Sequence, residues 1–270
     1  MATTSPDLAA MAGLTGAEAR ARIRAGQWRR PTAGVAVGYA QANVVILPAA
    51  LAEPFREFCA RNPQACPLLE VTAPGSPEPR RVAPGADLRR DVPRYRVYHH
   101  GTVMAEVDHL LDLWRPDLVA FLLGCSFTTE AALLRAGVRL RHLEQGTAVP
   151  MYRTNRACAP AGPFHGPLVV SMRPLPPAQV ELARAVTARY PRAHGAPVHV
   201  GDPAALGIAD LSCPDYGAPV PMAAGEVPVF WACGVTPQAA AEAARLEFMI
   251  THAPGHMFIT DLRDEELADG

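Results

Sequence analysis

The sequence predicts an α/β protein with an irregular order of strands and helices. Short apolar runs rich in β-branched residues, such as 44–47 and 227–232, have the length of buried strands. Ala-rich segments with helix start and stop signals lie between such runs, but not at the regular spacing of one βαβ series. This order is typical of an α/β fold with an inserted portion or a mixed sheet. A chain of 270 residues is long enough for two domains or one large domain.

In the first half of the chain, each expected element has a local signal. Thr15-Gly16-Ala17-Glu18 fits a capping box, which predicts a helix that continues to Arg24. The apolar run over 110–123 contains Pro116, which predicts a short helix and then a helix or strand that enters Gly124. The other expected elements are strands over 44–47, 67–72 and 138–143, helices over about 50–61 and 127–136, and an alternating hairpin over 94–107.

In the second half, two helices stand out. Thr236-Pro237 places a capping hydroxyl before a proline at the first helical position, and the segment over 177–190 is amphipathic. The expected strands lie near 149–153, 168–172, 197–200, 227–232, 248–251 and 257–260.

The composition excludes several classes of function. The 25 basic and 26 acidic side chains give a formal charge of -1, without the basic face that nucleic-acid binding requires. No window approaches the ~18 consecutive apolar residues of a membrane-spanning helix. Residues 1–10 lack the basic and apolar segments of a secretory signal. We therefore expect a soluble cytoplasmic protein that binds a small molecule but neither nucleic acid nor membrane, with a homo-oligomer left open.

The chain has no lysine, so all 25 basic residues are arginine. This excludes a lysine Schiff base, a pyridoxal-phosphate anchor and a P-loop lysine. A cation in a site is then arginine or histidine, and a general base is histidine, a carboxylate or a cysteine thiolate. The six cysteines include no Cys-x-x-Cys pair, which argues against a zinc ribbon and predicts free thiols. We expect no cofactor and no metal.

Two segments of similar sequence are candidate anion sites. Segments 121–128 and 230–236 each contain an apolar run, a cysteine turn and a threonine, and each precedes an Ala-rich helix. Amides at a helix N-terminus bind anions and lower the pKa of a nearby thiol. The two turns are therefore expected to face one cleft and hold a carboxylate, unless the small residues only allow tight turns and the likeness is chance. The residues concerned are Cys125, Ser126, Cys233, Gly234 and Thr236.

Four histidines lie in two short loops that contain proline and glycine. His194 and His199 enclose one such segment, and His252 and His256 enclose the other. Proline between the paired histidines argues against a helical metal-binding face. Rigid loop histidines suit general acid or base catalysis near neutral pH, although each imidazole could instead bond a nearby carbonyl and fix its loop.

A further acid–base pair is predicted on the strand over 138–143. Alternation along the strand places His142 and Glu144 on one face, where they form either a catalytic pair or an ordered surface contact.

Two arginines are candidates for a carboxylate clamp. Arg153 and Arg173 end apolar strands, and strand ends are where α/β sheets place ligands. A guanidinium can hold a carboxylate with two hydrogen bonds. The alternative for each arginine is a structural salt bridge.

Several phrases of the sequence occur together in one known family. They are PTAGVAVGYAQAN at 31–43, GCSF at 124–127, VPMYRT at 149–154, VSMRP at 170–174, HGAPVHVGDP at 194–203, EVPVFWACGVTPQ at 226–238 and THAPGHMFITD at 251–261. In these phrases the chain resembles the YcsI-like hydro-lyase family, which is related to the N-terminal part of D-glutamate cyclase. Thr129 and Ala148 depart from the family pattern, which leaves substrate choice open.

The resemblance implies an α/β fold with two intertwined subdomains. One is a three-layer α/β/α subdomain on a mixed sheet, and the other is a smaller two-layer α/β sandwich. The single family domain would cover 14–262, with flexible termini at 1–13 and 263–270. The family name implies a lyase that eliminates water, as in cyclisation of D-glutamate to 5-oxo-D-proline.

Three hypotheses follow. The first is a hydro-lyase for a small amino or hydroxy carboxylate, in which arginine and amides hold the carboxylate while histidines move protons. The second is a non-catalytic carboxylate sensor that uses the same groups. The third is a metal-dependent hydrolase that uses the histidine pairs, and it requires stoichiometric metal in the untagged protein.

Overall fold

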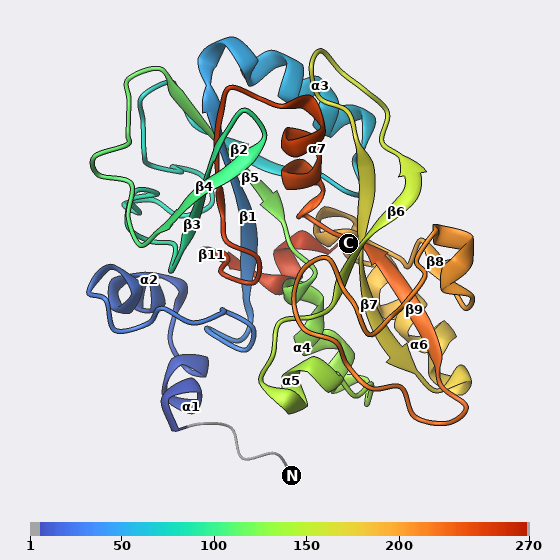
Figure 1. The fold of residues 1–270 in the computed structure, drawn as a ribbon. Coiled ribbons are helices and arrows are strands. Elements are labelled where there is room, and N and C mark those ends of the chain that lie inside the picture. The colour runs from blue at the N-terminus through green and yellow to red at the C-terminus, as the bar shows by residue number, and fades with distance from the viewer. Residues whose placement is uncertain (1–5, 269–270) are drawn as a thin grey trace.

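The computed structural model describes residues 6–268, which form two β-sheets with helices packed against them (Figure 1). The first sheet has the order β2-β5-β1-β10-β3-β4, with β11 also paired to β1. The second has the order β6-β7-β9-β8. The first contains β1 (Tyr39–Pro48), β2 (Leu68–Val71), β3 (Tyr95–His99), β4 (Thr102–Val107), β5 (Leu118–Gly124), β10 (Phe248–His252) and β11 (Phe258–Arg263). The second contains β6 (Met151–Ala157), β7 (Pro167–Leu175), β8 (His199–Val200) and β9 (Val227–Ala232). The predicted α/β class is confirmed.

The path of the chain makes the second sheet an insertion into the first. Strands β1 to β5 build the first sheet, β6 to β9 build the second, and β10 and β11 return to the first. The strand pairs within both sheets of the described chain are antiparallel. The expectation of a mixed sheet is therefore wrong in this detail. Antiparallel neighbours can pair without the helical crossover that a parallel pair requires.

Strand β1 is the centre of the first sheet because both of its faces are apolar. Val44 and Ile46 join the core on one face, and Val45 and Leu47 join the core on the other. The second of these cores is covered by α3 (Ala52–Arg61) and α7 (Thr236–Ala244). Such a doubly covered strand gives the continuous apolar run seen in the sequence.

The second sheet also buries both faces. On one face, Val180 and Ala183 of α6 (Pro177–Ala188) pack with Trp231 of β9. On the other face, Met172 and Phe230 pack against a long irregular segment over 206–220.

The remaining helices connect the sheets or lie near the ends of the described chain. They are α1 (Pro6–Ala12), α2 (Gly16–Arg24), α4 (Phe127–Arg135), α5 (Arg141–Gln145) and the 3₁₀ turns η1 (Ala49–Leu51), η2 (Pro191–Ala193), η3 (Pro203–Leu206) and η4 (Asp264–Leu267). The predicted capping box at Thr15 is present, with both reciprocal hydrogen bonds to Glu18. Residues 264–267, expected in a flexible terminus, form η4 with Leu267 buried. Residues 1–5 and 269–270 of the expected termini lie outside the described residues.

The strand predicted over 138–143 is wrong. The segment bends at Leu140 and forms α5, which ends at Gly146 in the left-handed conformation with φ 65°. Glycine is favoured there because a Cβ atom would strain the backbone. The predicted hairpin is confirmed, with His100 and Gly101 at its turn, both at positive φ. Within residues 6–268, no helix combines the length and the apolar character needed to cross a membrane.

Candidate active site

The two similar turns of the sequence lie together where the sheets meet. Gly124 ends β5 and leads into α4, while Cys233 and Gly234 follow β9 and lead into α7. Asn43 of β1 connects them: its Nδ2 donates a hydrogen bond to the Gly124 carbonyl at 2.7 Å. A Cβ atom on Gly234 would lie only 2.0 Å from the same Nδ2 atom. Cys125 and Cys233 share one apolar cluster. The expected juxtaposition of the two turns is therefore present.

A buried arginine is the centre of the polar groups beside these turns. Arg173 of β7 is 2% exposed. Its Nη2 donates to Glu130 Oε1 at 3.0 Å and to Ser126 Oγ at 3.3 Å. Its Nη1 donates to Ser171 Oγ at 3.2 Å, and the guanidinium lies 5.4 Å from the centre of the Trp231 ring. The guanidinium charge is thus held in place by a carboxylate, two hydroxyls and an aromatic face.

Glu130 links this arginine to a buried histidine. His142 Nε2 lies 2.7 Å from Glu130 Oε1, the same oxygen that Arg173 contacts. Burial opposes ionisation of Glu130, but the His142 and Arg173 contacts outweigh it and place the pKa of this carboxyl below its usual value. Glu130 is therefore ionised at neutral pH.

The predicted His142–Glu144 pair is wrong. On the helical turn α5 the two side chains diverge: His142 is buried against Glu130, while Glu144 accepts a hydrogen bond from Arg139 at the surface. The error follows from the misassigned strand, since alternation places both residues on one face only in extended backbone.

His194 contributes an imidazole with one free nitrogen. The residue follows η2 with φ 75° and is 1% exposed. Its Nδ1 lies 2.7 Å from the Gln64 carbonyl oxygen, which can only accept, so Nδ1 carries the hydrogen and Nε2 has the lone pair. Burial lowers the pKa of His194 to about 4; the Gln64 and Gly124 carbonyls oppose this shift, and the nearby positive charge of Arg173 adds to it. His194 is therefore neutral at neutral pH.

Two buried atoms in this neighbourhood have no hydrogen-bond partner in the described chain. They are Arg173 Nε, a donor, and His194 Nε2, an acceptor. Buried polar atoms without a partner are costly, so these two atoms are the groups of this cluster with unused capacity to bond a ligand.

The cysteines differ from the expectation in their proton state. Burial raises the pKa of Cys233 to about 11 and raises that of Cys125 well above its usual value, although the backbone amides at the two helix starts act in the opposite direction. Desolvation of a thiolate thus exceeds the helix-terminus effect. Both thiols stay protonated at neutral pH, which removes them as thiolate bases.

Thr236 and Gly234 also have structural partners. Thr236 Oγ1 accepts from the Val169 amide at 3.1 Å and donates to the Cys233 carbonyl at 2.7 Å. The side chain of Asn43 fills the space beside Gly234. The turn after β9 therefore supplies packing and rigidity next to Arg173.

The other predicted arginine lies apart from this cluster. Arg153 is inside β6 and 40% exposed, and it contacts Glu242 and the Tyr216 hydroxyl. The Asp215 carboxylate accepts from its backbone amide at 2.8 Å. Its contacts correspond to the structural salt bridge that we considered as the alternative.

Three of the four loop histidines also lie elsewhere. His199 is on the edge strand β8, where its Nε2 bonds the Asp202 carbonyl at 2.8 Å. His252 is buried, with Nδ1 3.1 Å from the Val44 amide nitrogen, and burial lowers its pKa to about 4. His256 lines a surface hollow of about 450 Å³ together with Glu106. The structure thus brings only His194 and His142 close to Arg173.

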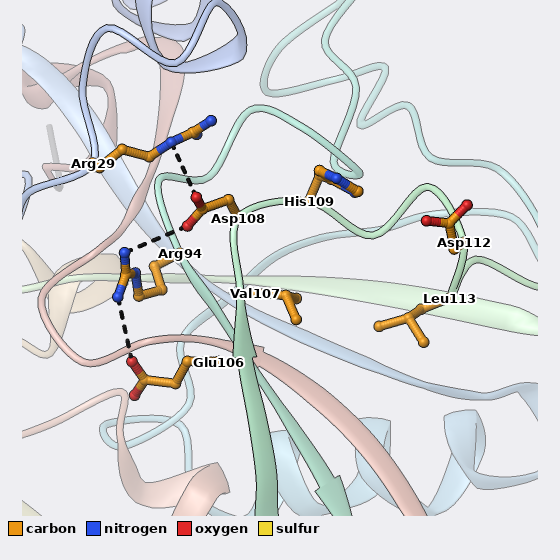
Figure 2. A pocket seen from close by; sticks show the side chains of 8 residues that line it. All are labelled: Arg29, Arg94, Glu106, Val107, Asp108, His109, Asp112 and Leu113. Carbon is orange, nitrogen blue, oxygen red and sulfur yellow. Dashed lines mark ion pairs between the residues drawn. The ribbon is translucent and has the colours of Figure 1, made fainter.

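An adjacent open hollow of about 660 Å³ is built from charged residues. Figure 2 shows Arg29, Asp108, Arg94 and Glu106 connected in a row of ion pairs. The N–O distances in this row are 3.4 to 3.9 Å, and all four side chains are partly solvated. Such exposed pairs are typical of a solvated surface. Within residues 6–268, no group of three or more His, Cys, Asp or Glu side chains is arranged to hold a metal ion.

Comparison with known proteins shows the family of this chain. The D-glutamate cyclase family model matches residues 119–261. A protein of Rubrobacter xylanophilus named "Putative hydro-lyase" is 66% identical over 250 residues, which cover 93% of this chain and 96% of that protein. The chain belongs to the D-glutamate cyclase family.

Further relatives extend over almost the whole chain. A protein of the same name from Stutzerimonas stutzeri is 61% identical over 97% of this chain and 98% of its own length. "Putative hydro-lyase GK2103" of Geobacillus kaustophilus is 58% identical over 95% of this chain and 97% of its own. A nitrogen repressor-like protein of Methanococcus jannaschii covers 90% of this chain and 97% of its own, but its TM-score of 0.38 and identity of 9% are too low to support an argument.

The cluster around Arg173 and the two turns contains residues that sequence reasoning missed. Glu130 has the features of an ordinary helical glutamate in the sequence, and Asn43 those of a residue at the edge of a strand. Ser171 could have been found, because it lies two residues before Arg173 and therefore on the same face of β7.

Proposed function

We propose that the chain is a hydro-lyase for a small amino or hydroxy carboxylate, and that cyclisation of D-glutamate to 5-oxo-D-proline and water is the first reaction to test. The names of the relatives and of the family support the reaction class. The observation that carries the proposal is the pair of unpartnered buried atoms, Arg173 Nε and His194 Nε2. One is a cationic donor and the other a neutral base.

Arg173 would bind the carboxylate of the substrate. Its terminal nitrogens contact Glu130, Ser126 and Ser171, so its Nε remains available to a ligand. A buried cation binds an anion strongly because little water screens the pair. Ser126, at the start of α4, and Ser171 would orient the bound group through their hydroxyls.

His194 would act as the general base. Burial is the main cause of the low pKa of His194, and the positive charge of Arg173 is a smaller one. A carboxylate on Arg173 would offset that charge and would therefore raise the pKa of His194 above about 4. The base then gains strength only when substrate is bound.

In the cyclisation, the amine nitrogen of D-glutamate attacks the carbon of the side-chain carboxyl group. A C–N bond forms, a C–O bond breaks, and the departing oxygen leaves as water. With the amine neutral and the side-chain carboxyl group in its acid form, one proton has to move. His194 would take this proton from the attacking nitrogen and return it to the departing hydroxyl group, which leaves as water. The ionised Glu130 would hold Arg173 and His142 in place through their shared contact with its Oε1.

The test is incubation of the purified protein with D-glutamate, L-glutamate, 5-oxoproline and a panel of hydroxy acids, read by mass spectrometry. We expect loss of one water from one of these compounds, and Arg173→Ala should reduce turnover at least ~100-fold. Arg184→Ala is the matched control, because Arg184 is exposed and pairs with Glu181 on α6. Full turnover by Arg173→Ala would refute the assignment.

A carboxylate-binding sensor is the second candidate. The pKa of about 4 for His194 favours it, because an imidazole this difficult to protonate is a weak base at neutral pH. The sensor predicts that a carboxylate raises the melting temperature of the wild type but not of Arg173→Ala, and that no compound of the panel is converted.

A further inference from the structure

The turn η4, which follows β11, begins with a buried carboxyl group. Asp264 is 3% exposed, and its Oδ1 has almost no surface open to solvent, although the residue lines a partly open hollow between the loop over 34–39 and α4. The same oxygen has no hydrogen-bond partner in the described chain. An ionised carboxylate held in this position would have neither water nor a donor at Oδ1, so its negative charge would be costly.

The charges around Asp264 do not compensate for its burial. Burial, and after it the charge of Glu265, raise the pKa of Asp264 to about 7, whereas Arg135 of α4 and Arg263 of β11 act against this shift. The other titratable or charged side chains on this turn and on the elements packed against it are Glu130 of α4, Tyr39 of β1, Asp261 of β11, Arg192 of η2 and Glu266 of η4 itself.

The contacts that hold η4 in place include one apolar anchor. Leu267 is fully buried in the core of the first sheet, in the same cluster as Ala193. The Asp264 amide donates to the Gly38 carbonyl at 3.1 Å. The ion pair of Glu265 with Arg135 is exposed and 3.5 Å long, so it adds little. A short turn held in this way can open locally while the sheet stays folded.

The turn also touches elements of the candidate site. It packs against η2, which is followed directly by His194. The hollow lined by Asp264 is also lined by Glu130 of α4, the carboxylate that contacts Arg173. A movement of η4 would therefore remove a neighbour from two of the elements that position the cluster.

We propose that η4 is a pH-sensitive latch, which stays closed on η2 and α4 while Asp264 is protonated and opens when Asp264 is ionised. Opening exposes the carboxylate to water, which supplies the hydrogen bonds that Oδ1 lacks in the closed turn. The latch is a property of the fold, and it does not depend on which reaction the chain catalyses.

The pH range of the latch follows from the two proton affinities of Asp264. In the open turn its pKa returns to the ordinary 3.8, while in the closed turn it is about 7. The closed turn therefore binds more protons between these values, is most favoured below about pH 4 and loses stability as pH rises to about 7. The ratio of open to closed turns should rise by up to ~10-fold per pH unit in this range and level off above it.

The experiment is hydrogen exchange of the full chain at about pH 5 and about pH 7, read by mass spectrometry of peptides. Each rate is corrected for the intrinsic pH dependence of amide exchange. The rate of a peptide over 264–268 should rise at least ~10-fold between the two conditions. A peptide over α6 should show no such rise, because α6 packs on the inserted sheet away from this turn. This comparison separates local opening from global unfolding.

Three variants test the role of the carboxyl group. Asp264→Asn keeps the shape but not the charge, and should abolish the rise. Glu265→Gln, the matched control, removes an exposed carboxylate of the same turn and should retain it. Leu267→Ala removes the anchor and should speed exchange already at about pH 5. No rise in the wild type, an equal rise in Asp264→Asn or an equal rise in the α6 peptide would overturn the latch.

Discussion

Burial decides whether the reactive side chains of this chain, its buried cysteines and histidines, are protonated. Cys125 and Cys233 lie at helix starts, yet desolvation keeps both thiols protonated. The same effect keeps His194 and His252 neutral, since burial lowers both pKa values to about 4. Sequence proximity to a helix N-terminus indicates the direction of one contribution, but only the fold gives the desolvation that opposes it.

Thiol accessibility gives a direct check. The six cysteines are unbridged, and Cys213 is exposed while the other five are buried. Under native conditions at about pH 8, iodoacetamide should modify Cys213 first and the other five at least ~10-fold more slowly, because a buried protonated thiol is a poor nucleophile. Peptide mass spectrometry measures the order of modification. Early modification of Cys125 in the folded protein would contradict the burial argument.

Asp264 provides a second check at the level of one residue. Its pKa rises from the ordinary 3.8 to about 7, so the folded state binds more protons than the unfolded state between these values. Stability associated with Asp264 is therefore present at low pH and is lost as pH rises toward 7. Asp264→Asn should raise the melting temperature at about pH 8 by ~2 °C or more, and change it little at about pH 4. A pH-independent effect would refute the shift.

The candidate site was partly accessible from the sequence. Arg173 and the cysteine turns were found because strand ends and helix starts are common places for ligands. Glu130 was missed, since nothing local distinguishes a glutamate that points into a core from one on the surface. His142 was identified with the wrong partner, because its partner depended on whether the segment around it was extended or helical.

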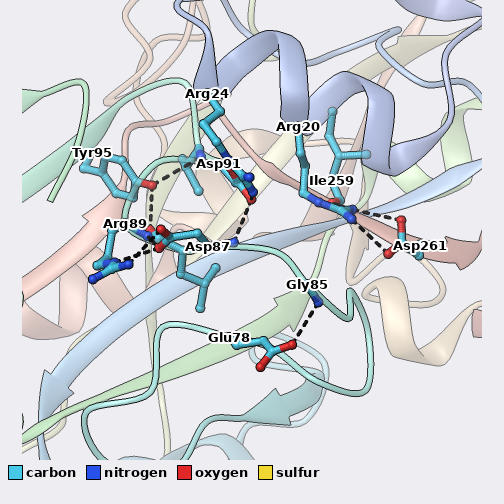
Figure 3. Close-up of polar contacts among 12 residues, drawn as sticks. Arg20, Arg24, Glu78, Gly85, Asp87, Arg89, Asp91, Tyr95, Ile259 and Asp261 are labelled. Atoms are coloured by element: carbon cyan, nitrogen blue, oxygen red, sulfur yellow. Dashed lines mark hydrogen bonds and ion pairs between the residues drawn. The ribbon is translucent and has the colours of Figure 1, made fainter. Parts of the chain in front are cut away.

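At the scale of elements, one buried arginine attaches helix α2 to the first sheet. Arg20 donates to the Ile259 carbonyl at 2.9 Å and to both carboxylate oxygens of Asp261 on β11 (Figure 3). A second pair, Arg24 with Asp91, connects the same helix to the loop before β3. Two-point contacts of this kind fix both position and orientation of a helix.

Removal of the first contact should loosen α2. Arg20→Ala leaves the Ile259 carbonyl without its side-chain donor and the Asp261 carboxylate without its partner, so we expect a loss of ~2 kcal/mol in the free energy of unfolding. Arg184→Ala removes an exposed pair with Glu181 and should cost less than ~0.5 kcal/mol. Denaturant titrations of both variants measure the difference. Equal losses would show that the buried contact is not the stronger one.

Most elements could be predicted from local signals, because caps, proline positions and apolar runs act over a few residues. The capping box at Thr15 and the start at Thr236-Pro237 are examples. The segment 138–143 could not be assigned in this way. Its alternation fits a strand, but a left-handed glycine and the burial of His142 against another helix make a helical turn more favourable.

At the scale of the whole molecule, the inserted sheet meets the first sheet at a contact where the backbone leaves no space for a Cβ atom. Gly234 follows β9 of the inserted sheet, and its Cα faces the amide of Asn43 on β1 of the other. Gly124 is similarly close to the Arg192 carbonyl, which a Cβ atom would approach to 1.7 Å. Both glycines are needed because of close approach to atoms from another part of the fold.

This contact predicts a non-additive pair of substitutions. Gly234→Ala should cost ~2 kcal/mol or more, because its methyl group overlaps the Asn43 side chain. In the background of Asn43→Ala the same substitution should cost markedly less, since the space is then free. A double-mutant cycle by denaturant unfolding measures the coupling. Additive costs would indicate that the two sheets do not depend on this contact.

The arrangement of the two sheets was the least predictable level. Irregular spacing of elements indicated an inserted portion, and the resemblance implied two subdomains. The antiparallel pairing throughout both described sheets was not foreseen, because buried antiparallel and parallel strands share the same continuous apolar pattern when both faces are covered.

Glu130 Oε1 contacts both His142 Nε2 and Arg173 Nη2, so one oxygen atom of α4 is shared by a side chain of α5 and a side chain of β7. The three elements therefore cannot move independently around this atom. A displacement of α5 should change the position of the Arg173 guanidinium even where β7 itself keeps its place.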